Sequence, residues 1–200
     1  MATEHVERYL EVFESLRRRK RWSTGNEVLR FAALTLTASD VTGSEVDLEA
    51  AARELADAAG AFSPLSSAVR HAVAAILIRR GFEPSAVARS TKEALALFKQ
   101  HKLNRGTMQA ALAALLLVLD AGGRCPRPEA VIRLRSILDR WKQDHRWLTG
   151  NDDYPMAAMH ATRDVSVESL GLEVEQIYQT LASARFRKGE QLQLATHILA

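Results

Sequence analysis

Cysteine, aromatic residues and long apolar runs are all scarce in this chain of 200 residues. Its single cysteine, Cys125, rules out a disulfide framework and a thiolate metal cage, and it is typical of a reducing compartment. The longest apolar run, from Ala110 to Leu119, is about half as long as a helix that spans a bilayer. The first residues lack the basic and then apolar order of a signal peptide. We therefore expect a cytoplasmic protein that does not enter a membrane.

Helix-forming residues dominate the composition. Alanine, leucine, glutamate and arginine are abundant, and these side chains lose little rotamer freedom in a helix. Apolar positions recur with the helical period, as at Tyr9, Phe13 and Leu16, whereas no segment alternates as a strand does. The ten glycines and five prolines fall at regular intervals and are not gathered in a linker. The sequence predicts an all-α fold with one domain over residues 1–200.

One phrase occurs twice, at residues 21–33 and 146–158. Arginine, tryptophan, threonine, glycine, asparagine and two alanines coincide between the copies, and Glu27 corresponds to Asp152. Such an internal echo is typical of a helical-repeat protein. Helical hairpins are expected to begin, at spacings of 39, 42 and 44 residues, near Thr24, Ser63, Arg105 and Thr149. Because these spacings suit two-helix repeats, we predict a right-handed α–α superhelix (solenoid) of about four hairpins with terminal capping helices.

Local signals predict where other helices begin and end. Pro64 is expected in the first turn of a helix that ends before Gly81, where a left-handed C-cap favours glycine. Either Asn104 or Thr107 caps the most apolar helix. The last helix begins after Gly189 and stops with the chain. It is either a terminal capping helix or part of a further hairpin in a longer repeat protein.

The repeated phrase has a structural and a functional interpretation. As structure, Thr24-x-x-Glu27 and Thr149-x-x-Asp152 are capping boxes that open helices, and the preceding tryptophans pack as hydrophobic staples. As a binding site, the phrase supplies these candidates: Trp22, Thr24, Asn26, Trp147, Thr149, Asn151, Asp152 and Asp153. We favour the structural interpretation, because capping explains both copies.

The second copy, from Trp147 to Ala157, lies between helical segments and resembles a bacterial family of proteins, domain-of-unknown-function family 4003. The resemblance covers most of the chain and implies relatives that usually extend further. It brings no activity, substrate or cofactor with it. Because His160 stands where another apolar residue is expected, any role of this histidine would be particular to this chain.

A metal-dependent enzyme is the sharpest alternative for the second copy. Asp153, His160 and Asp164 recur on one face of the expected helix, with Asp152 beside them. Carboxylate oxygens are ligands for hard cations. The first copy has Val28 in place of Asp153, so metal chemistry would belong to one copy alone. We expect no metal and no cofactor.

Charge is segregated along the chain. Residues 63–102 carry seven basic residues against two acids, and residues 105–144 carry seven against four, whereas residues 24–60 and 149–184 each have a net charge of −5. The basic middle, residues 63–144, includes Arg70, Arg79, Arg80, Arg89, Lys92, Lys99, Lys102 and Arg105. Such a band can meet nucleic-acid phosphates or an acidic partner, or can be a solvated surface with salt bridges between repeats.

We expect a binding or scaffold protein without catalytic activity, which receives a protein or peptide in the groove of a helical repeat. Side chains expected near that groove are Ser67, Arg70, His71, Gln109 and the cluster Asn151–Asp153, and Arg79 and Arg80 contribute to the basic band. Nucleic-acid binding through residues 63–144 ranks second, because this band lacks interleaved aromatic residues and the net charge is only +3. The metal-dependent enzyme ranks third. Self-association of the basic middle with the acidic ends is a further expectation.

Overall fold

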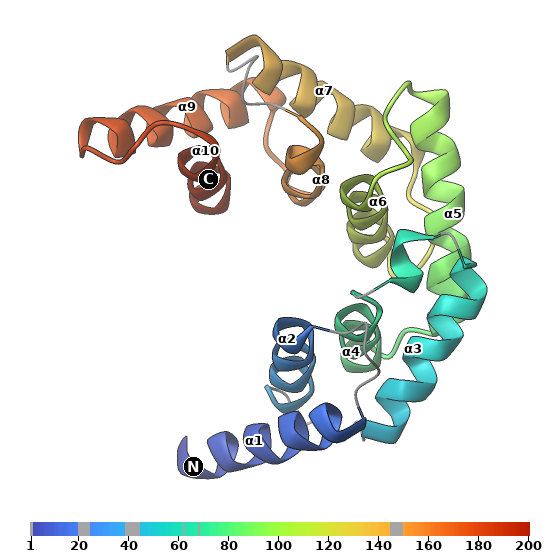
Figure 1. Cartoon of the computed structure of the whole chain (residues 1–200). Coiled ribbons are helices and arrows are strands. Elements are labelled where there is room, and N and C mark those ends of the chain that lie inside the picture. The colour runs from blue at the N-terminus through green and yellow to red at the C-terminus, as the bar shows by residue number, and fades with distance from the viewer. Residues whose placement is uncertain (1, 20–24, 39–44, 62, 68, 145–149) are drawn as a thin grey trace. The chain divides into compact units, whose positions relative to one another are not determined.

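The computed structural model describes residues 2–19, 25–38, 45–61, 63–67, 69–144 and 150–200. Within these residues it contains ten α-helices, two short 3₁₀ turns and no strand, so the all-α prediction is confirmed (Figure 1). None of the described helices combines the length and the apolar character needed to cross a bilayer. The chain divides into two compact units, residues 1–92 and 93–200.

Helix-on-helix packing builds the first unit. Its elements are α1 (Ala2–Arg19), α2 (Asn26–Thr37), α3 (Glu45–Ala59), the 3₁₀ turn η1 (Pro64–Ser66), α4 (Arg70–Arg80) and the first part of α5 (Pro84–Gln100). Helix α2 packs against α4, while α1 covers α2 and α3 covers α4. The amphipathic pattern expected for the first helix is confirmed, because Phe13 and Leu16 are buried in the core of this unit.

The helix expected from Pro64 to Gly81 is interrupted, so this prediction was wrong at its start. The chain makes only the short turn η1 after Pro64, and α4 begins at Arg70. Serine side chains bond to the local backbone here: Ser63 Oγ accepts from the Leu65 N–H, and Ser66 Oγ donates to the Ser63 carbonyl at 2.7 Å. These bonds compete with helical ones. The C-terminal part of the prediction is confirmed, since Gly81 ends α4 with a left-handed φ of 66°.

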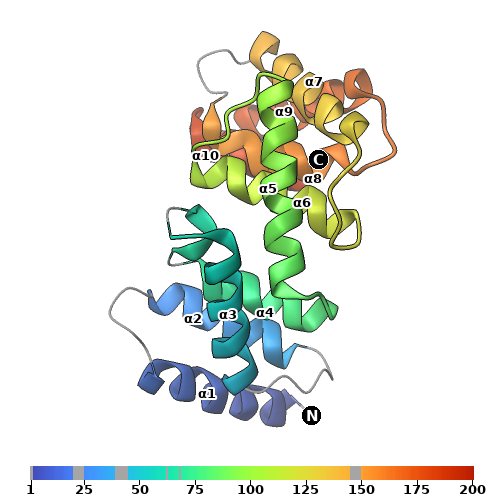
Figure 2. The same cartoon turned by 90° about the vertical axis from the view of Figure 1, so that its right-hand side faces the viewer.

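The second unit is built from the remaining helices. They are the rest of α5, α6 (Met108–Asp120), α7 (Pro128–Asp144), the 3₁₀ turn η2 (Asn151–Asp153), α8 (Tyr154–Ala161), α9 (Val167–Ser183) and α10 (Glu190–Leu199). Helix α8 packs against α6 and α7, and α9 packs against α7 and α10 (Figure 2). Thr107, rather than Asn104, caps α6, because its Oγ1 accepts from the Ala110 N–H at 3.2 Å.

The alanines shared by the two copies of the phrase occupy equivalent places in the packing. Ala32 and Ala33 of α2 are fully buried, as are Ala157 and Ala158 of α8. Each pair belongs to a helix that packs closely against another helix rich in buried alanine, α4 in the first unit and α6 in the second. Small side chains let two helix axes approach. Helix packing therefore explains this part of the repeated phrase.

Candidate functional site

The second copy of the phrase joins several elements of the second unit. Asn151 Oδ1 accepts from Asn104 Nδ2 at 3.0 Å, and Asp152 Oδ1 accepts from Gln109 Nε2 at 2.6 Å. The hydroxyl of Tyr154, the first residue of α8, accepts from the backbone N–H of Asn104 at 2.9 Å. These three contacts fasten turn η2 and the first residue of α8 to the loop before α6 and to α6 itself.

Asp153 is directed to the opposite side and is buried. Its Oδ2 accepts from the Gly150 N–H at 2.7 Å, and its Oδ1 lies 3.3 Å from Gln193 Nε2 and 3.8 Å from His197 Nε2 on α10. Burial raises the pKa of Asp153 above its ordinary value, and the hydrogen bond from Gly150, which favours the carboxylate, opposes this rise. Two neighbouring acidic side chains raise the pKa further.

His160 is a second buried polar residue that contacts α10. Its Nε2 lies 2.9 Å from the backbone carbonyl of His197, and a carbonyl only accepts, so Nε2 carries the proton. Nδ1 then accepts from Arg163 Nη1 at 3.3 Å. Burial, together with the positive charge of Arg163, lowers the pKa of His160, while the hydrogen bond to His197 and the charge of Glu173 raise it by less. His160 is therefore held as a neutral imidazole.

Trp141 of α7 completes this group, which we call the Asp153 cluster: Trp141, Asp153, His160, Gln193 and His197. The Trp141 ring stacks on His197 with centroids 3.8 Å apart and meets the edge of His160 at 5.7 Å. All five side chains are buried. The cluster joins α7, α8 and α10, although 37 residues separate His160 from His197. The spacing of Asp153 and His160 predicted that these two share a helix face, but no local spacing could have revealed their partners on α7 and α10.

The arrangement of the Asp153 cluster favours a structural role. The side chains of His197 and Asp153 are only 1% and 12% exposed, so a substrate has no access to the pair. Of the four metal-ligand candidates, Asp153 and His160 both face α10, but Asp152 turns to α6 and Asp164 is exposed beyond the end of α8. Among the described residues, no group of three or more His, Cys, Asp or Glu side chains is placed to hold a metal ion.

The predicted capping boxes rest on threonines outside the described residues, and within those residues a side-chain cap is seen in the second copy but not in the first. Four members of the phrase lie outside the described residues: Trp22, Thr24, Trp147 and Thr149. In the first copy Gly25 precedes α2 with extended backbone angles, and Asn26 is the first residue of the helix. In the second copy Asp153, not Asp152, reaches back to the N–H of Gly150. Asp152 is displaced from that role because the chain makes a 3₁₀ turn before α8.

The remaining site candidates lie on α4 in the first unit. Arg70 and His71 begin the helix, and Arg79 and Arg80 are exposed in its last turn. His71 is buried, with its Nε2 3.1 Å from the Glu49 Oε2 of α3. His71 thus fastens α3 to α4, whereas the two arginines at the other end of the helix are accessible to a partner.

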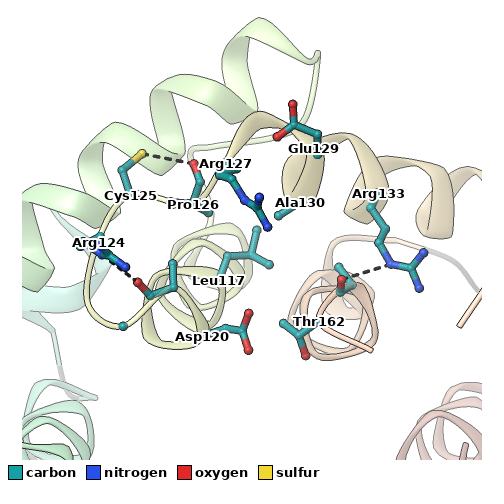
Figure 3. Close-up of a pocket in the computed structure, with 13 residues that line it drawn as sticks. Leu117, Asp120, Arg124, Cys125, Pro126, Arg127, Glu129, Ala130, Arg133 and Thr162 are labelled. Atoms are coloured by element: carbon teal, nitrogen blue, oxygen red, sulfur yellow. Dashed lines mark hydrogen bonds between the residues drawn. The ribbon is translucent and has the colours of Figure 1, made fainter. Parts of the chain in front are cut away.

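A pocket with a volume of about 930 Å³ opens where α6 ends, α7 begins and α8 ends (Figure 3). We call it the α6–α8 pocket. Its lining includes Leu117, Asp120, Arg124, Arg127, Glu129 and Thr162. Sequence reasoning missed this pocket. The available signal was the charged loop after Gly122 and Gly123, but only the fold brings the end of α8 beside that loop.

The charged side chains of the α6–α8 pocket differ in what they already bind. Arg133 donates to three carbonyls after or at the end of α8, those of Ala161, Arg163 and Val165. Arg124 makes one long bond, from Nε to the Ala121 carbonyl at 3.4 Å. Three further charged side chains have no hydrogen-bond or ion-pair partner among the described residues: Asp120, Arg127 and Glu129. The pocket therefore holds charges that remain available to a ligand.

Cys125 lies in the lining of the same pocket and is half-buried. Its Sγ is 3.7 Å from the Pro126 carbonyl. Burial raises the pKa of the thiol, and the negative charge of Glu93 adds to the rise. The thiol is thus a poor nucleophile, in agreement with the interpretation of Cys125 as an inert loop cysteine.

These features define an all-helical protein with a closed polar cluster and an open charged pocket. The chain belongs to the bacterial family described as "Protein of unknown function (DUF4003)", whose family model matches residues 12–200. It is similar to "Uncharacterized protein YeaA" of Bacillus subtilis (strain 168), with 24% identity over 204 aligned positions that cover 98% of this chain. The chain spans 60% of the length of that relative. No solved structure matches the chain.

Proposed function

We propose that this protein is a non-catalytic binding module for a protein or peptide partner, built from helical hairpins that stack as an α–α solenoid. The α6–α8 pocket is the observation that carries the proposal. Its volume of about 930 Å³ lies near the upper end of the range for ligand sites, and it presents charged side chains without protein partners. A cytoplasmic partner suits a chain whose only cysteine remains a thiol.

The state of the candidate catalytic residues supports binding rather than catalysis. Asp153 and His160 are committed to α10, and Asn151 and Asp152 are committed to the neighbouring loop and α6. A general acid or base must reach the proton that it transfers. These side chains are instead engaged by the protein's own helices and loops, and they hold α8 in place.

The test is a selection of peptides from a random dodecapeptide display library on the immobilised full chain. Enriched sequences are then synthesised with a fluorescent label and titrated with the chain at roughly physiological salt. We expect the selection to enrich related sequences. In solution, one labelled peptide should bind each folded chain, and the same peptide should not bind the heat-denatured chain. Failure of every enriched peptide to bind the folded chain in solution would reject the proposal.

A second candidate function is nucleic-acid binding by the basic middle, residues 63–144. It is favoured by the exposure of cations in each unit considered alone: Arg79, Arg80 and Arg89 in the first, and Lys99, Lys102 and Arg105 in the second. Anisotropy of labelled single- and double-stranded nucleic acid at about 50 and 200 mM salt tests it. Binding that collapses at the higher salt, and that Arg79→Glu with Arg80→Glu weakens, would put this function first.

A further inference from the structure

The α6–α8 pocket has a definite arrangement of charge and apolar surface. Figure 3 shows the Arg127 guanidinium beside Ala130 and directed toward Leu117, while Asp120 and Thr162 lie on the far side of Leu117. Leu117, which is only 2% exposed, and the partly exposed Ala130 thus lie between a cationic side and an anionic side of the pocket. A ligand that fills this pocket has to place unlike polar groups at its two ends and an apolar part between them.

The cationic side of the pocket is suited to a carboxylate. Arg127 has no partner among the described residues, and Arg124, three residues earlier in the same loop, has only its long bond to a carbonyl. Guanidinium groups bind carboxylates through paired hydrogen bonds, and these charge-assisted bonds are among the strongest polar contacts in proteins. Arg133 is less available than these two, because its Nε and Nη2 already donate to carbonyls at the end of α8.

The anionic side distinguishes between classes of ligand. Asp120 offers a carboxylate without a partner, and Thr162 keeps its hydroxyl lone pairs free to accept while its proton goes to the Met159 carbonyl at 2.8 Å. These acceptors attract an N–H group or a cation and repel a chain of phosphates. A peptide carries carboxylates, N–H donors and apolar side chains in a short length, whereas a nucleic acid does not.

We propose that the α6–α8 pocket binds a peptide segment through an acidic side chain held by Arg127 and Arg124, with Asp120 accepting from a cation or N–H donor of the same segment. This proposal rests on the proposed binding function and adds the chemistry of the partner. Between these two polar contacts the segment lies against the partly exposed Ala130, so a small aliphatic side chain fits there.

Cys125 makes the site directly testable in the intact chain. It is the only cysteine of the sequence and it lines the pocket, so any thiol reaction reports on this place alone. The probes are the peptides enriched by the display selection, each synthesised with its acidic residues intact and with each acid changed to the neutral amide. We expect the enriched peptides to contain an acidic residue. The acidic forms should bind the chain and slow the modification of Cys125 by a disulfide reagent, and the amide forms should do neither.

The matched variants separate the pocket from the rest of the surface. Arg127→Ala should weaken binding of the acidic peptides by roughly tenfold or more, and Arg127→Glu, used as bait in a second selection, should abolish the enrichment of acids. Lys142→Ala removes an exposed cation about 20 Å further along α7 and should leave binding unchanged. Circular dichroism confirms that each variant is folded.

Each contrary outcome has its own meaning. Peptides that bind but neither protect Cys125 nor respond to Arg127→Ala would overturn this inference while the proposed binding function stands. Equal binding of acidic and amide peptides would overturn the carboxylate assignment. Protection of Cys125 by free glutamate or inorganic phosphate as strong as by the peptides would overturn the peptide assignment, and so would protection by nucleic acid. Absence of any binding peptide would reject the proposed function itself.

Discussion

Two polar regions of the second unit, the Asp153 cluster and the α6–α8 pocket, use charge in opposite ways. In the cluster, ionisable groups on α8 and α10 face one another and are closed off from solvent. In the pocket, Asp120 and Arg127 face open space and have no partner among the described residues. Helix α8 contributes to both regions, because it carries His160 of the cluster and its end, at Ala161 and Thr162, lines the pocket. The comparison teaches that the candidate metal ligands Asp153 and His160 stabilise the fold. Asp120 and Arg127, which no motif in the sequence singled out, are the charges available to a ligand.

The largest expected effect is the loss of Trp141 from the Asp153 cluster. Its ring is 2% exposed and stacks on His197, so Trp141→Ala removes a large buried surface and leaves a cavity. We expect the free energy of unfolding to fall by about 3–5 kcal/mol in urea titrations. Ile132→Ala on the same helix is the control, because Ile132 is 47% exposed and its loss should cost less than about 1 kcal/mol. Equal costs would mean that the cluster is not packed as described.

The two adjacent aspartates of turn η2 should differ in their importance for stability. Asp153→Ala leaves the Gly150 N–H and the Gln193 amide without their acceptor, and we expect a loss of about 1–3 kcal/mol. Asp152→Ala removes one exposed hydrogen bond from Gln109 and should cost at most about 1 kcal/mol. Thermal denaturation of the two variants beside the parent chain measures the difference. A larger cost for Asp152→Ala would contradict the assignment of the capping role to Asp153.

Two arginines of the α6–α8 pocket provide a comparison within the pocket itself. Arg133→Ala frees three carbonyls at the end of α8, and we expect it to lower stability by about 1–2 kcal/mol. Arg127→Ala breaks no contact and should change stability by less than about 0.5 kcal/mol. The urea midpoints of the two variants, compared with that of the parent chain, measure these two losses of stability. If Arg127→Ala proved as costly as Arg133→Ala, then Arg127 would serve the fold and not a ligand.

The Asp153 cluster should make stability depend on pH through His160. Its pKa in the folded chain lies below the ordinary value of 6.5, so the unfolded chain takes up a proton first as the pH falls. The contribution of the neutral ring to stability is therefore complete above pH 6.5 and is lost as the pH falls through the lowered pKa. His160→Gln keeps a donor for His197 and an acceptor for Arg163 but does not titrate. The difference in urea midpoint between the parent chain and this variant should shrink on acidification, and a constant difference would contradict the argument.

The smallest effect concerns the thiol of the pocket. Because burial and the charge of Glu93 raise the pKa of Cys125, alkylation by iodoacetamide should reach its half-maximal rate at a higher pH than in a short peptide with the same thiol. Glu93→Gln removes the smaller of these two causes and should move the profile slightly back toward lower pH. A profile identical to that of the peptide would mean that the thiol is not buried in the pocket wall.

Local features of the fold were predictable because they depend on neighbouring residues in the chain. The amphipathic first helix, a cap at either Asn104 or Thr107 and the left-handed glycine at the end of α4 all follow from spacing and backbone preference. The serine-rich segment after Pro64 misled the prediction, because side-chain bonds to the backbone replaced the first helical turns. The echo between the copies predicted a helical repeat, and of its shared residues the two pairs of alanines are buried in helix packing.

The sequence by itself determined that this protein is helical, that its residues resemble those of one bacterial family, and that basic residues gather in the middle of the chain. Only the tertiary structure decided which polar residues are consumed by the fold. His160 and His197 meet because the fold brings α10 to the last turn of α8. Asp120 and Arg127 share a pocket because the ends of α6 and α8 and the start of α7 come together. The physical reason is that hydrogen bonds and burial act between atoms close in space, and helix packing brings together residues whose distance along the chain carries no signal.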